Sequence, residues 1–193
     1  MRLFLLARHG QSLFNVDQVV NGDPALDRGL SEQGIEEATR LGSQIAALPL
    51  DLVDVSPFPR ALQTANIALD GREVPHLVDE DLGDVRIGEL EGASLDAYRE
   101  SPGHHDPKVR FPGGESLDEA ALRYADACER LLARDEQVTF VVCHEIPVRY
   151  IANAAAGSDD LNGPLHYVAN ATPYLFDEAS LARAVERIRQ LAR

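Results

Sequence analysis

The segment Leu3-Phe4-Leu5-Leu6-Ala7-Arg8-His9-Gly10-Gln11-Ser12, near the start of the chain, decides the fold that we predict. Its first half is an uninterrupted apolar run, and its second half is abruptly polar. A short continuous apolar run is typical of a strand that is buried on both faces of a parallel sheet. The run is shorter than the roughly 7–15 apolar residues of a signal-peptide core, and no small-residue cleavage site follows it. We therefore expect a buried first strand over Arg2–Ala7.

Strand-like and helix-like patterns alternate along the rest of the chain. Further strands are expected at Leu52–Val55, His76–Leu82 and Val138–Cys143. Helices are expected at Glu32 to about Leu48, Arg60–Leu69, Ser116–Ala133, Pro147–Ala156 and Leu181–Leu191. This alternation predicts an α/β fold, a three-layer α/β/α sandwich with a mostly parallel central sheet. Since no repeat, low-complexity tract or linker-like stretch interrupts it, we expect one domain over residues 1–193.

Two of the expected helices have a clear apolar face. Ser31 is predicted to cap the first helix, whose apolar face is expected to hold Ile35, Ala38, Leu41, Gly42, Ile45 and Ala46. The last helix carries Leu181, Val185, Ile188 and Leu191 at helical spacing. That face fits packing on this domain or on a second subunit, so a homodimer stays open.

The chain is strongly acidic, with a formal net charge of −14 at pH 7. Nucleic acids and anionic membranes are held by basic protein surface, so we expect neither as a partner. No stretch approaches the roughly 18 consecutive apolar residues of a membrane span. Only Cys128 and Cys143 are present, which is too few for a disulfide framework and does not match metal-site spacing. We expect a cytoplasmic protein with reduced thiols.

Cationic residues follow three of the expected strands. Arg8 and His9 follow the first strand, Arg60 comes shortly after the second, and His144 follows the last. Ligands of open α/β sheets bind beyond the carboxyl ends of the strands, so these side chains should converge. Buried cations need an anionic partner, and arginine matches phosphate oxygens with paired hydrogen bonds, while Gly10 lets the backbone approach the ligand. The sequence therefore predicts a site for a phosphoryl group.

The residues after the first strand also carry a family resemblance. Arg8-His9-Gly10-Gln11-Ser12 with Asn15 is similar to the signature of the histidine phosphatase (phosphoglycerate mutase-like) superfamily: Arg-His-Gly, Glu or Gln, Thr or Ser, and a following Asn. Later blocks of that family are matched in order by Leu30–Gly34, Ser56–Ala65, Gly88–Gly92, Gly114–Ser116 and Val141–His144. The resemblance covers roughly residues 2–153 and is closest to the phosphatase branch.

The resemblance implies a metal-independent phosphomonoester hydrolase that needs no cofactor and acts on a small-molecule phosphomonoester, which the sequence does not identify. It implies that His9 attacks phosphorus and becomes a phosphohistidine, which water then hydrolyses. This role needs a neutral imidazole, and an unperturbed histidine is largely neutral at pH 7. Arg8, Asn15, Arg60 and His144 are implied to hold the phosphate oxygens and to stabilise charge in the transition state.

A proton donor is also required, because an alkoxide leaves poorly unless it is protonated as the bond breaks. Members of the family commonly have a Glu shortly before the Gly-x-x-Glu-Gly block, and the matching residue here is Asp84. Aspartate can perform the same proton transfer with a side chain that is one methylene shorter. We predict Asp84 as the donor, with Glu80 and Glu89 as the alternatives.

Glu145 is a second departure, because the family often has glycine directly after the second histidine. The backbone amide of Glu145 can still donate to a phosphate, so we include Glu145 among the phosphate-binding residues. Its carboxylate must point away from the phosphate, pair with a basic side chain, or select a substrate that carries a cation or a hydroxyl group. The sequence leaves these three roles open.

Three rival functions are compatible with parts of the sequence. A phosphoglycerate mutase-type phosphotransferase is disfavoured because Ala93–Gly114 is short and Val85 stands where mutases have arginine. A cysteine phosphatase fits the pattern Cys-x5-Arg at Cys143 and Arg149, but Pro147 lacks an N–H and no glycine lies between them. A catalytically weak phosphate-binding relative is supported only by the two departures at positions 84 and 145.

The segment Ala93–Glu115 is predicted to be a lid over the pocket, since loops at strand ends set specificity in such folds. It carries Arg99, Lys108, Arg110 and Phe111. His104-His105-Asp106, within this segment, has the residue types of a metal cluster. Adjacent histidines in a loop rich in proline and glycine are more typical of a solvated surface patch, so we expect no metal.

Overall fold

The computed structural model describes residues 2–192 of the chain, and its centre is one five-stranded sheet in the order β3-β2-β4-β1-β5. The strands are β1 (Leu3–Arg8), β2 (Leu52–Val55), β3 (His76–Val78), β4 (Val138–Cys143) and β5 (Pro173–Asp177). Strands β1 to β4 pair in parallel, and β5 runs antiparallel to β1 at one edge. The predicted α/β fold with a mostly parallel sheet is confirmed.

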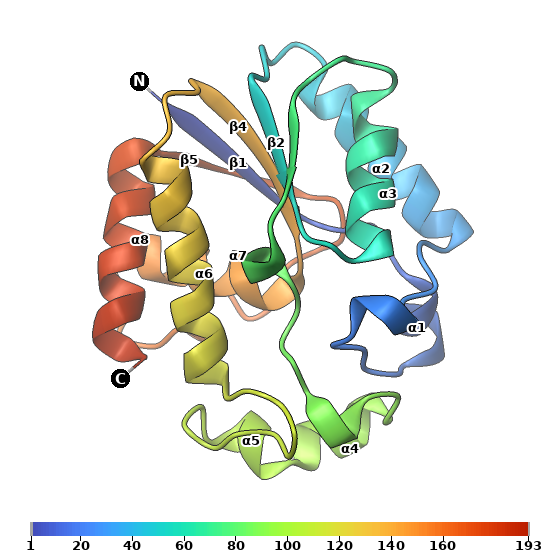
Figure 1. The fold of residues 1–193 in the computed structure, drawn as a ribbon, viewed down its shortest axis with the longest axis vertical. Helices are drawn as coiled ribbons and strands as arrows, with labels where there is room; N and C mark the ends of the chain where they lie inside the picture. Colours follow the sequence, from blue (N-terminus) through green and yellow to red (C-terminus); the bar gives the residue numbers. More distant parts are fainter. Residues whose placement is uncertain (1, 193) are drawn as a thin grey trace.

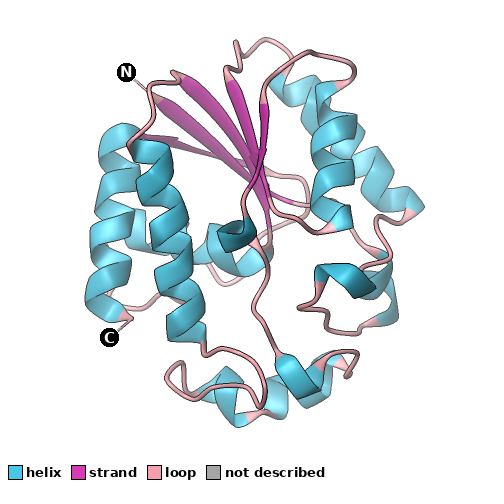
Figure 2. Ribbon diagram, in the orientation of Figure 1, coloured by secondary structure: helices cyan, strands magenta, loops and turns pink. Residues whose placement is uncertain are grey.

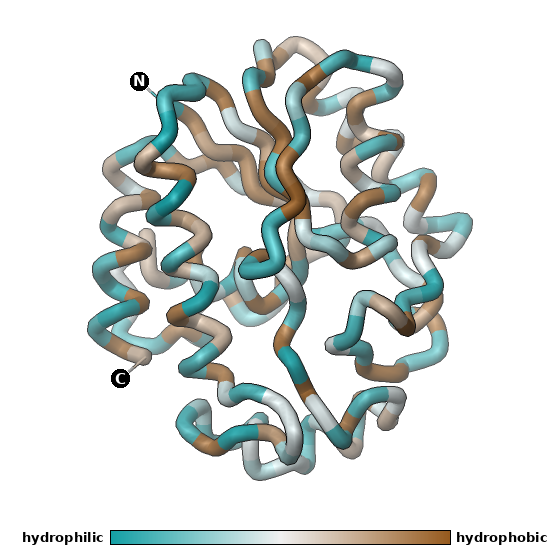
Figure 3. The backbone as a smooth tube through the Cα atoms, viewed as in Figure 1, coloured by the Kyte–Doolittle hydropathy of each residue, from teal (hydrophilic) through white to brown (hydrophobic). Residues whose placement is uncertain are grey.

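Helices cover both faces of the sheet (Figure 1). Helices α2 (Glu32–Ile45) and α3 (Pro59–Leu69) lie on one face. The other face is covered by α6 (Leu117–Leu132), α7 (Glu145–Ala155) and α8 (Glu178–Leu191). The two cores that result are separated by the strands, whose hydrophobic residues form the brown centre of Figure 3.

Alternation along β1 divides its side chains between the two cores. Phe4 and Leu6 pack toward α6 and α8, whereas Leu5 and Ala7 pack toward α2 and α3. Because both faces are covered, every position from Phe4 to Arg8 is buried, which explains the continuous apolar run in the sequence. The same holds for all of β4.

Helix α2 begins where the sequence predicts, but its buried face differs in part from the predicted apolar face. Ser31 caps it, with its side chain accepting a hydrogen bond from the Gly34 amide. Ile35 is 47% exposed and Ala46 is also exposed, so the buried face covers only part of the predicted apolar face and includes Ala38, Leu41 and Ile45. Gly34 takes the buried position instead, because its backbone packs against that of Gln11 and leaves no room for a side chain.

Several boundaries differ from the predictions, and Figure 2 shows the helices, strands and loops as the structure has them. The third strand was expected to reach Leu82, but β3 ends at Val78 and a 3-10 turn, η2 (Glu80–Leu82), follows it. Asp79 causes the change, because its side chain accepts a hydrogen bond from the Asp81 amide and caps that turn. The short helices α1 (Leu13–Asp17), α4 (Leu95–Glu100) and α5 (Pro102–His105), and strand β5, were not predicted.

Helix α8 uses its apolar face within this chain. Leu181, Val185 and Ile188 are buried against α6 and α7, while Leu191 is half-buried. This apolar stripe therefore packs on the domain itself, and a homodimer stays a prediction without support from it. No helix within residues 2–192 is both long enough and apolar enough to cross a membrane.

Candidate active site

The carboxyl ends of the parallel strands bring the predicted residues together. Arg8 pairs in register with Cys143, so the next residues along each strand, His9 and His144, are neighbours with ring centroids 5.2 Å apart. Arg60 lies in the first turn of α3, which follows β2. Figure 1 shows α1 and α4 on the side of the sheet where these strands end.

A cavity of about 620 Å³ opens at this point. Of the predicted site residues, six line it: Arg8, His9, Asn15, Arg60, Asp84 and Glu145. His144 does not line the cavity, because it is fully buried behind Arg60. The alternative donors Glu80 and Glu89 do not line it either. The cavity thus contains two carboxylates, those of Asp84 and Glu145.

The imidazole of His9 is held in one tautomer. Its Nδ1 lies 2.6 Å from the carbonyl oxygen of Gly10, which can only accept, so Nδ1 carries the proton. Its Nε2 accepts a hydrogen bond from Nε of Arg60 at 3.1 Å. Burial, followed by the nearby charges of Arg60 and Arg8, holds the pKa of His9 well below its usual range. A neutral ring with its lone pair on Nε2 is the form that can attack an electrophile.

Arg60 is the centre of the hydrogen-bond network. Its Nη2 donates to Oδ2 of Asp84 at 3.0 Å, and its Nη1 donates to Oδ1 of Asn21 at 2.6 Å. The side chain of Asp27 is fully buried beside it, with Oδ2 accepting from the backbone amide of Arg60 at 2.8 Å. These contacts fix the guanidinium next to His9. The cation is thereby kept in a buried position that it could not hold alone.

Sequence reasoning missed Asn21, Asp27 and Glu91. Glu91 belongs to a family block, but no role was assigned to it; its Oε1 accepts from Nδ2 of Asn21 and its Oε2 from the amide of Gly22, both at 2.7 Å. It therefore orients the Asn21 oxygen toward Arg60. The matched block was a signal for Glu91, whereas Asn21 and Asp27 lie in a loop whose partners are distant in sequence and gave none.

His144 is neutral and supports the site from behind. Its Nε2 lies 2.7 Å from Oγ of Ser56, and its Nδ1 accepts from Nη2 of Arg60 at 3.2 Å, so the proton is on Nε2. Burial, together with the charge of Arg60, holds the pKa of His144 well below its usual range. Oδ2 of Asp84 lies 3.4 Å from Nδ1 of the ring. His144 thus links Arg60 and Asp84 to the end of β2.

Glu145 pairs with two basic side chains. Its Oε2 lies 2.7 Å from Nη1 of Arg8, and its Oε1 lies 3.4 Å from Nη1 of Arg149. Of the three roles that the sequence left open for the carboxylate, pairing with a basic side chain is the one that the structure contains. Glu145 is also the first residue of α7, where backbone amides have no acceptor within the helix and attract anions.

Asn15 lies at the cavity but is partly engaged elsewhere. Its Oδ1 accepts from the backbone amide of Ser12 at 3.0 Å, and its backbone amide donates to Oγ of Ser12 at 3.1 Å. The two hydrogen bonds together cap α1. The cap uses the oxygen of the side-chain amide. Its Nδ2 is the atom suited to contact an anion in the cavity.

The predicted lid forms a wall of the cavity. Tyr98 and Arg99 from α4 and His104 from α5 line it. The His104 ring packs against Tyr98 with centroids 4.9 Å apart. Residues 2–192 contain no group of three or more His, Cys, Asp or Glu side chains that could hold a metal ion.

Cys143 lies outside the cavity. It is fully buried in β4, and this burial raises the pKa of its thiol. The nucleophile of a cysteine phosphatase is the thiolate, which such an environment disfavours. The geometry therefore speaks against the Cys-x5-Arg alternative.

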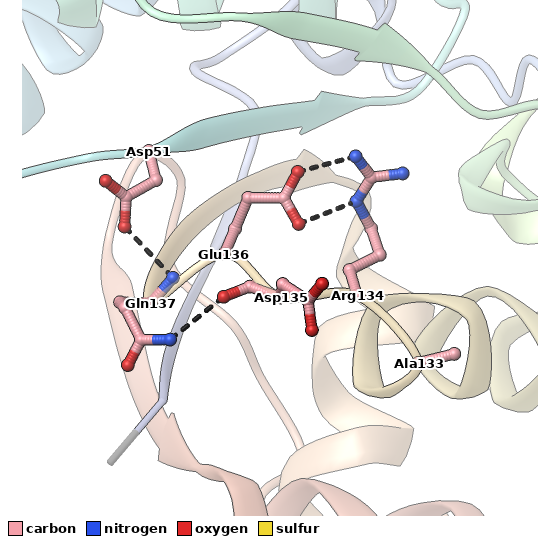
Figure 4. A pocket seen from close by; sticks show the side chains of 6 residues that line it. All are labelled: Asp51, Ala133, Arg134, Asp135, Glu136 and Gln137. Atoms are coloured by element: carbon pink, nitrogen blue, oxygen red, sulfur yellow. Dashed lines mark hydrogen bonds and ion pairs between the residues drawn. The ribbon is translucent and has the colours of Figure 1, made fainter.

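A second hollow lies at the opposite ends of the strands, where β2 and β4 begin (Figure 4). Two of the three carboxylates that line it, Asp51 and Glu136, have local partners. Asp51 accepts from the backbone amides of Gln137 and Val138, and Glu136 pairs with Arg134 at 2.6 Å. These contacts join a turn to the start of two strands, and we assign no chemistry to them.

The fold and the site together define an α/β protein that holds a neutral histidine among arginines in a cavity suited to a phosphoryl group. The chain belongs to the histidine phosphatase superfamily (branch 1), whose family model matches residues 4–189. The resemblance seen in the sequence is thereby confirmed.

Similar proteins include both mutases and phosphatases. The chain is 31% identical over 157 residues to the 2,3-bisphosphoglycerate-dependent phosphoglycerate mutase of Chlamydia muridarum, which covers 64% of this chain and 69% of that protein. The structure of Bacillus stearothermophilus YhfR has a TM-score of 0.81 and 27% identity, covering 92% of this chain and 91% of that one. The alpha-ribazole phosphatase from Shigella flexneri has a TM-score of 0.79 and 23% identity, covering 91% and 90%, a likeness of fold.

Proposed function

We propose that this protein is a phosphomonoester hydrolase that works through a phosphohistidine on His9 and requires no metal. The observation that carries the proposal is the hydrogen bonding of the ring. Because Nδ1–H is used by the Gly10 carbonyl, the lone pair is on Nε2, beside Arg60 in the cavity. The lowered pKa of His9 keeps that lone pair free of a proton at neutral pH.

The phosphate oxygens are bound by Arg8 and Arg60 in this proposal. Arg8 has a buried Nε without a hydrogen-bond acceptor among the described residues, and a phosphate oxygen is an acceptor that can satisfy it. The amide of Glu145 and Nδ2 of Asn15 add neutral donors. His144 joins this set only with a proton on Nδ1, since its Nδ1 otherwise accepts from Arg60.

In the first step, Nε2 of His9 forms a bond to phosphorus while the ester P–O bond breaks. Asp84, whose Oδ2 pairs with Arg60 in the free protein, takes part in this step in its protonated form: it gives its proton to the leaving oxygen and becomes a carboxylate, so an alcohol departs. Nδ1 of His9 keeps its proton throughout, held by the Gly10 carbonyl. Arginine donors stabilise the charge that develops on the phosphoryl oxygens.

In the second step, water attacks phosphorus and the P–N bond breaks. The Asp84 carboxylate takes a proton from that water, which restores the protonated carboxyl. Inorganic phosphate is released, and His9 returns to its neutral form with the lone pair on Nε2. The same carboxyl therefore acts as acid and then as base.

A phosphoglycerate mutase activity is the second candidate, because a curated relative at 31% identity is such a mutase. A mutase must return the phosphoryl group to an alcohol rather than to water. The arginine that mutases have after the donor is absent here, since Val85 lines the cavity at that position. This difference favours hydrolysis.

The test is hydrolysis of p-nitrophenyl phosphate with and without EDTA by wild type, His9→Ala and Cys143→Ser. We expect turnover that resists EDTA and is lost only in His9→Ala. Undiminished turnover in His9→Ala contradicts the mechanism. Phosphorus NMR with a phosphoglycerate then separates the two activities, because a hydrolase releases inorganic phosphate whereas a mutase yields the isomeric ester.

A further inference from the structure

The carboxylate of Glu145 lies between two guanidinium groups. It is 2.7 Å from Nη1 of Arg8 and 3.4 Å from Nη1 of Arg149, and its side chain is about one quarter exposed, at 28%. It also stands in the first turn of α7, where the helix dipole favours a negative charge. Glu145 therefore brings an acidic side chain, paired with two arginines, into the wall of the cavity.

This charge occupies part of Arg8. Nη1 of Arg8 donates to the carbonyl oxygen of Val168 at 2.9 Å and forms an ion pair with Oε2 of Glu145 at 2.7 Å. A guanidinium has five N–H donors, and Nε and Nη2 remain for a ligand. The carboxylate thus stands where an oxygen of an anionic ligand would otherwise bind.

The cations farther from His9 also have carboxylate partners. Arg149 pairs with Glu145, and Arg99 pairs with Asp96 at 3.4 Å. Arg149 keeps a buried Nε without an acceptor among the described residues, so its capacity to bind an anion is restrained rather than absent. Removal of the charge of Glu145 leaves two guanidinium groups, those of Arg8 and Arg149, available to anions.

We propose that Glu145 is a specificity-determining residue whose carboxylate competes with the substrate's anionic groups for Arg8 and Arg149. The cavity then accepts one phosphoryl group and favours an alcohol part that is neutral or cationic over one that carries a second anion. Two like charges held several ångströms apart repel more strongly in a partly buried site than in bulk water, and this repulsion disfavours a substrate with a second anion. This inference rests on the phosphatase function proposed above.

Binding of inorganic phosphate, measured by isothermal titration calorimetry, tests the competition without any turnover. Glu145→Gln keeps the length of the side chain and an acceptor oxygen but removes the charge. We expect Kd for phosphate to fall about three- to tenfold in this variant, because one competing charge is lost. Glu136→Gln is the matched control, since it removes one charge at the opposite ends of the strands and should leave Kd unchanged.

The direction of the change separates competition from a structural role. A residue that only positions Arg8 loosens phosphate binding when its charge is removed, so a higher or unchanged Kd in Glu145→Gln overturns the inference. Absence of phosphate binding in wild type and variant alike overturns the proposed function as well. Tighter binding in Glu145→Gln alone supports the inference.

A matched pair of substrates tests the selectivity. Para-carbamoylmethylphenyl phosphate and para-carboxymethylphenyl phosphate differ in one charge, and the methylene keeps their leaving groups similar. We expect wild type to prefer the amide, and Glu145→Gln to raise relative kcat/KM for the carboxylate about tenfold. An identical ratio of kcat/KM for the two substrates in wild type and variant overturns the proposed role of Glu145 in selectivity.

Discussion

Nε of Arg60 donates a hydrogen bond to Nε2 of His9 across 3.1 Å, so the lone pair proposed to attack phosphorus accepts from the guanidinium proposed to bind the phosphate. One N–H cannot serve the ring and a phosphate oxygen equally. A phosphate that takes this donor frees the lone pair of His9. In the proposed mechanism, substrate binding and activation of the nucleophile are therefore coupled through Arg60.

The pH dependence of kcat/KM should reflect the environment of His9. Burial and the charges of Arg60 and Arg8 lower its pKa, so the ring loses activity by protonation only well below pH 6.5. We expect the acid limb caused by His9 to lie below the ordinary histidine range, and the ring to stay neutral in an NMR titration across that range. An imidazole of His9 that titrates at or above 6.5 contradicts this expectation.

Asp84→Asn should slow phosphoryl transfer according to the leaving group. Asparagine cannot give a proton, so alkyl phosphates should lose roughly 10²–10⁴-fold in kcat, whereas p-nitrophenyl phosphate, whose leaving group needs no proton, should lose much less. Glu80→Gln is the control, because Glu80 does not line the cavity. Equal losses for both esters count against Asp84 as the donor.

Glu91→Gln should weaken substrate binding through Asn21 and Arg60. The carboxylate of Glu91 accepts two hydrogen bonds, from Asn21 and from the Gly22 amide, and a glutamine must present an N–H to one of these donors. We expect KM to rise about tenfold with a smaller change in kcat, as for one lost charged hydrogen bond. Glu89→Gln, two residues away and outside the cavity lining, should match wild type. Unchanged KM with a lowered Tm would indicate a purely structural role.

Asp54 should make stability depend on pH. It is 2% exposed in β2, its Oδ1 has no hydrogen-bond partner among residues 2–192, and burial, with Asp79 nearby, raises its pKa to about 7 from 3.8. The folded state keeps the proton while the unfolded chain loses it between these values. The free energy of unfolding therefore falls as the pH rises through that window, by up to about 4 kcal/mol.

Asp54→Asn removes this titration. We expect the variant to gain stability over wild type at about pH 8 and to show little difference at about pH 4, measured by urea denaturation. Buried His9 and His144 act in the opposite sense, since their lowered pKa values cost stability as the pH falls below 6.5. Both proteins share that effect, so the difference between them isolates Asp54. A difference that is independent of pH contradicts the assignment.

Local pattern was sufficient for the framework of the protein. The uninterrupted apolar runs of β1 and β4 predicted buried parallel strands, because only a strand covered on both faces needs no polar residue. The carboxyl ends of parallel strands lie on the same side of the sheet, so strand direction alone predicted that Arg8, His9, Arg60 and His144 lie together. The sequence did not predict strand β5 or the end of β3, because neither carries such a run. Strand β5 is half-exposed, and Asp79 caps the turn that follows β3.

The partners of each polar side chain required the tertiary structure. Hydrogen bonds from Arg60 reach Asn21, Asp84 and His144, which lie 39, 24 and 84 residues away, and no local pattern encodes such pairs. The same applies to the pairing of Glu145 with Arg8, whereas Arg149 lies four residues from Glu145 on the same helix. The amino-acid pattern was enough to predict strands β1, β2 and β4 and the cations that follow them, since the burial period is a local property. The contact of Arg60 with Nε2 of His9 and the pairing of Glu145 with Arg8 depend on the tertiary structure, because here a buried polar group is paired by a segment that is distant in sequence.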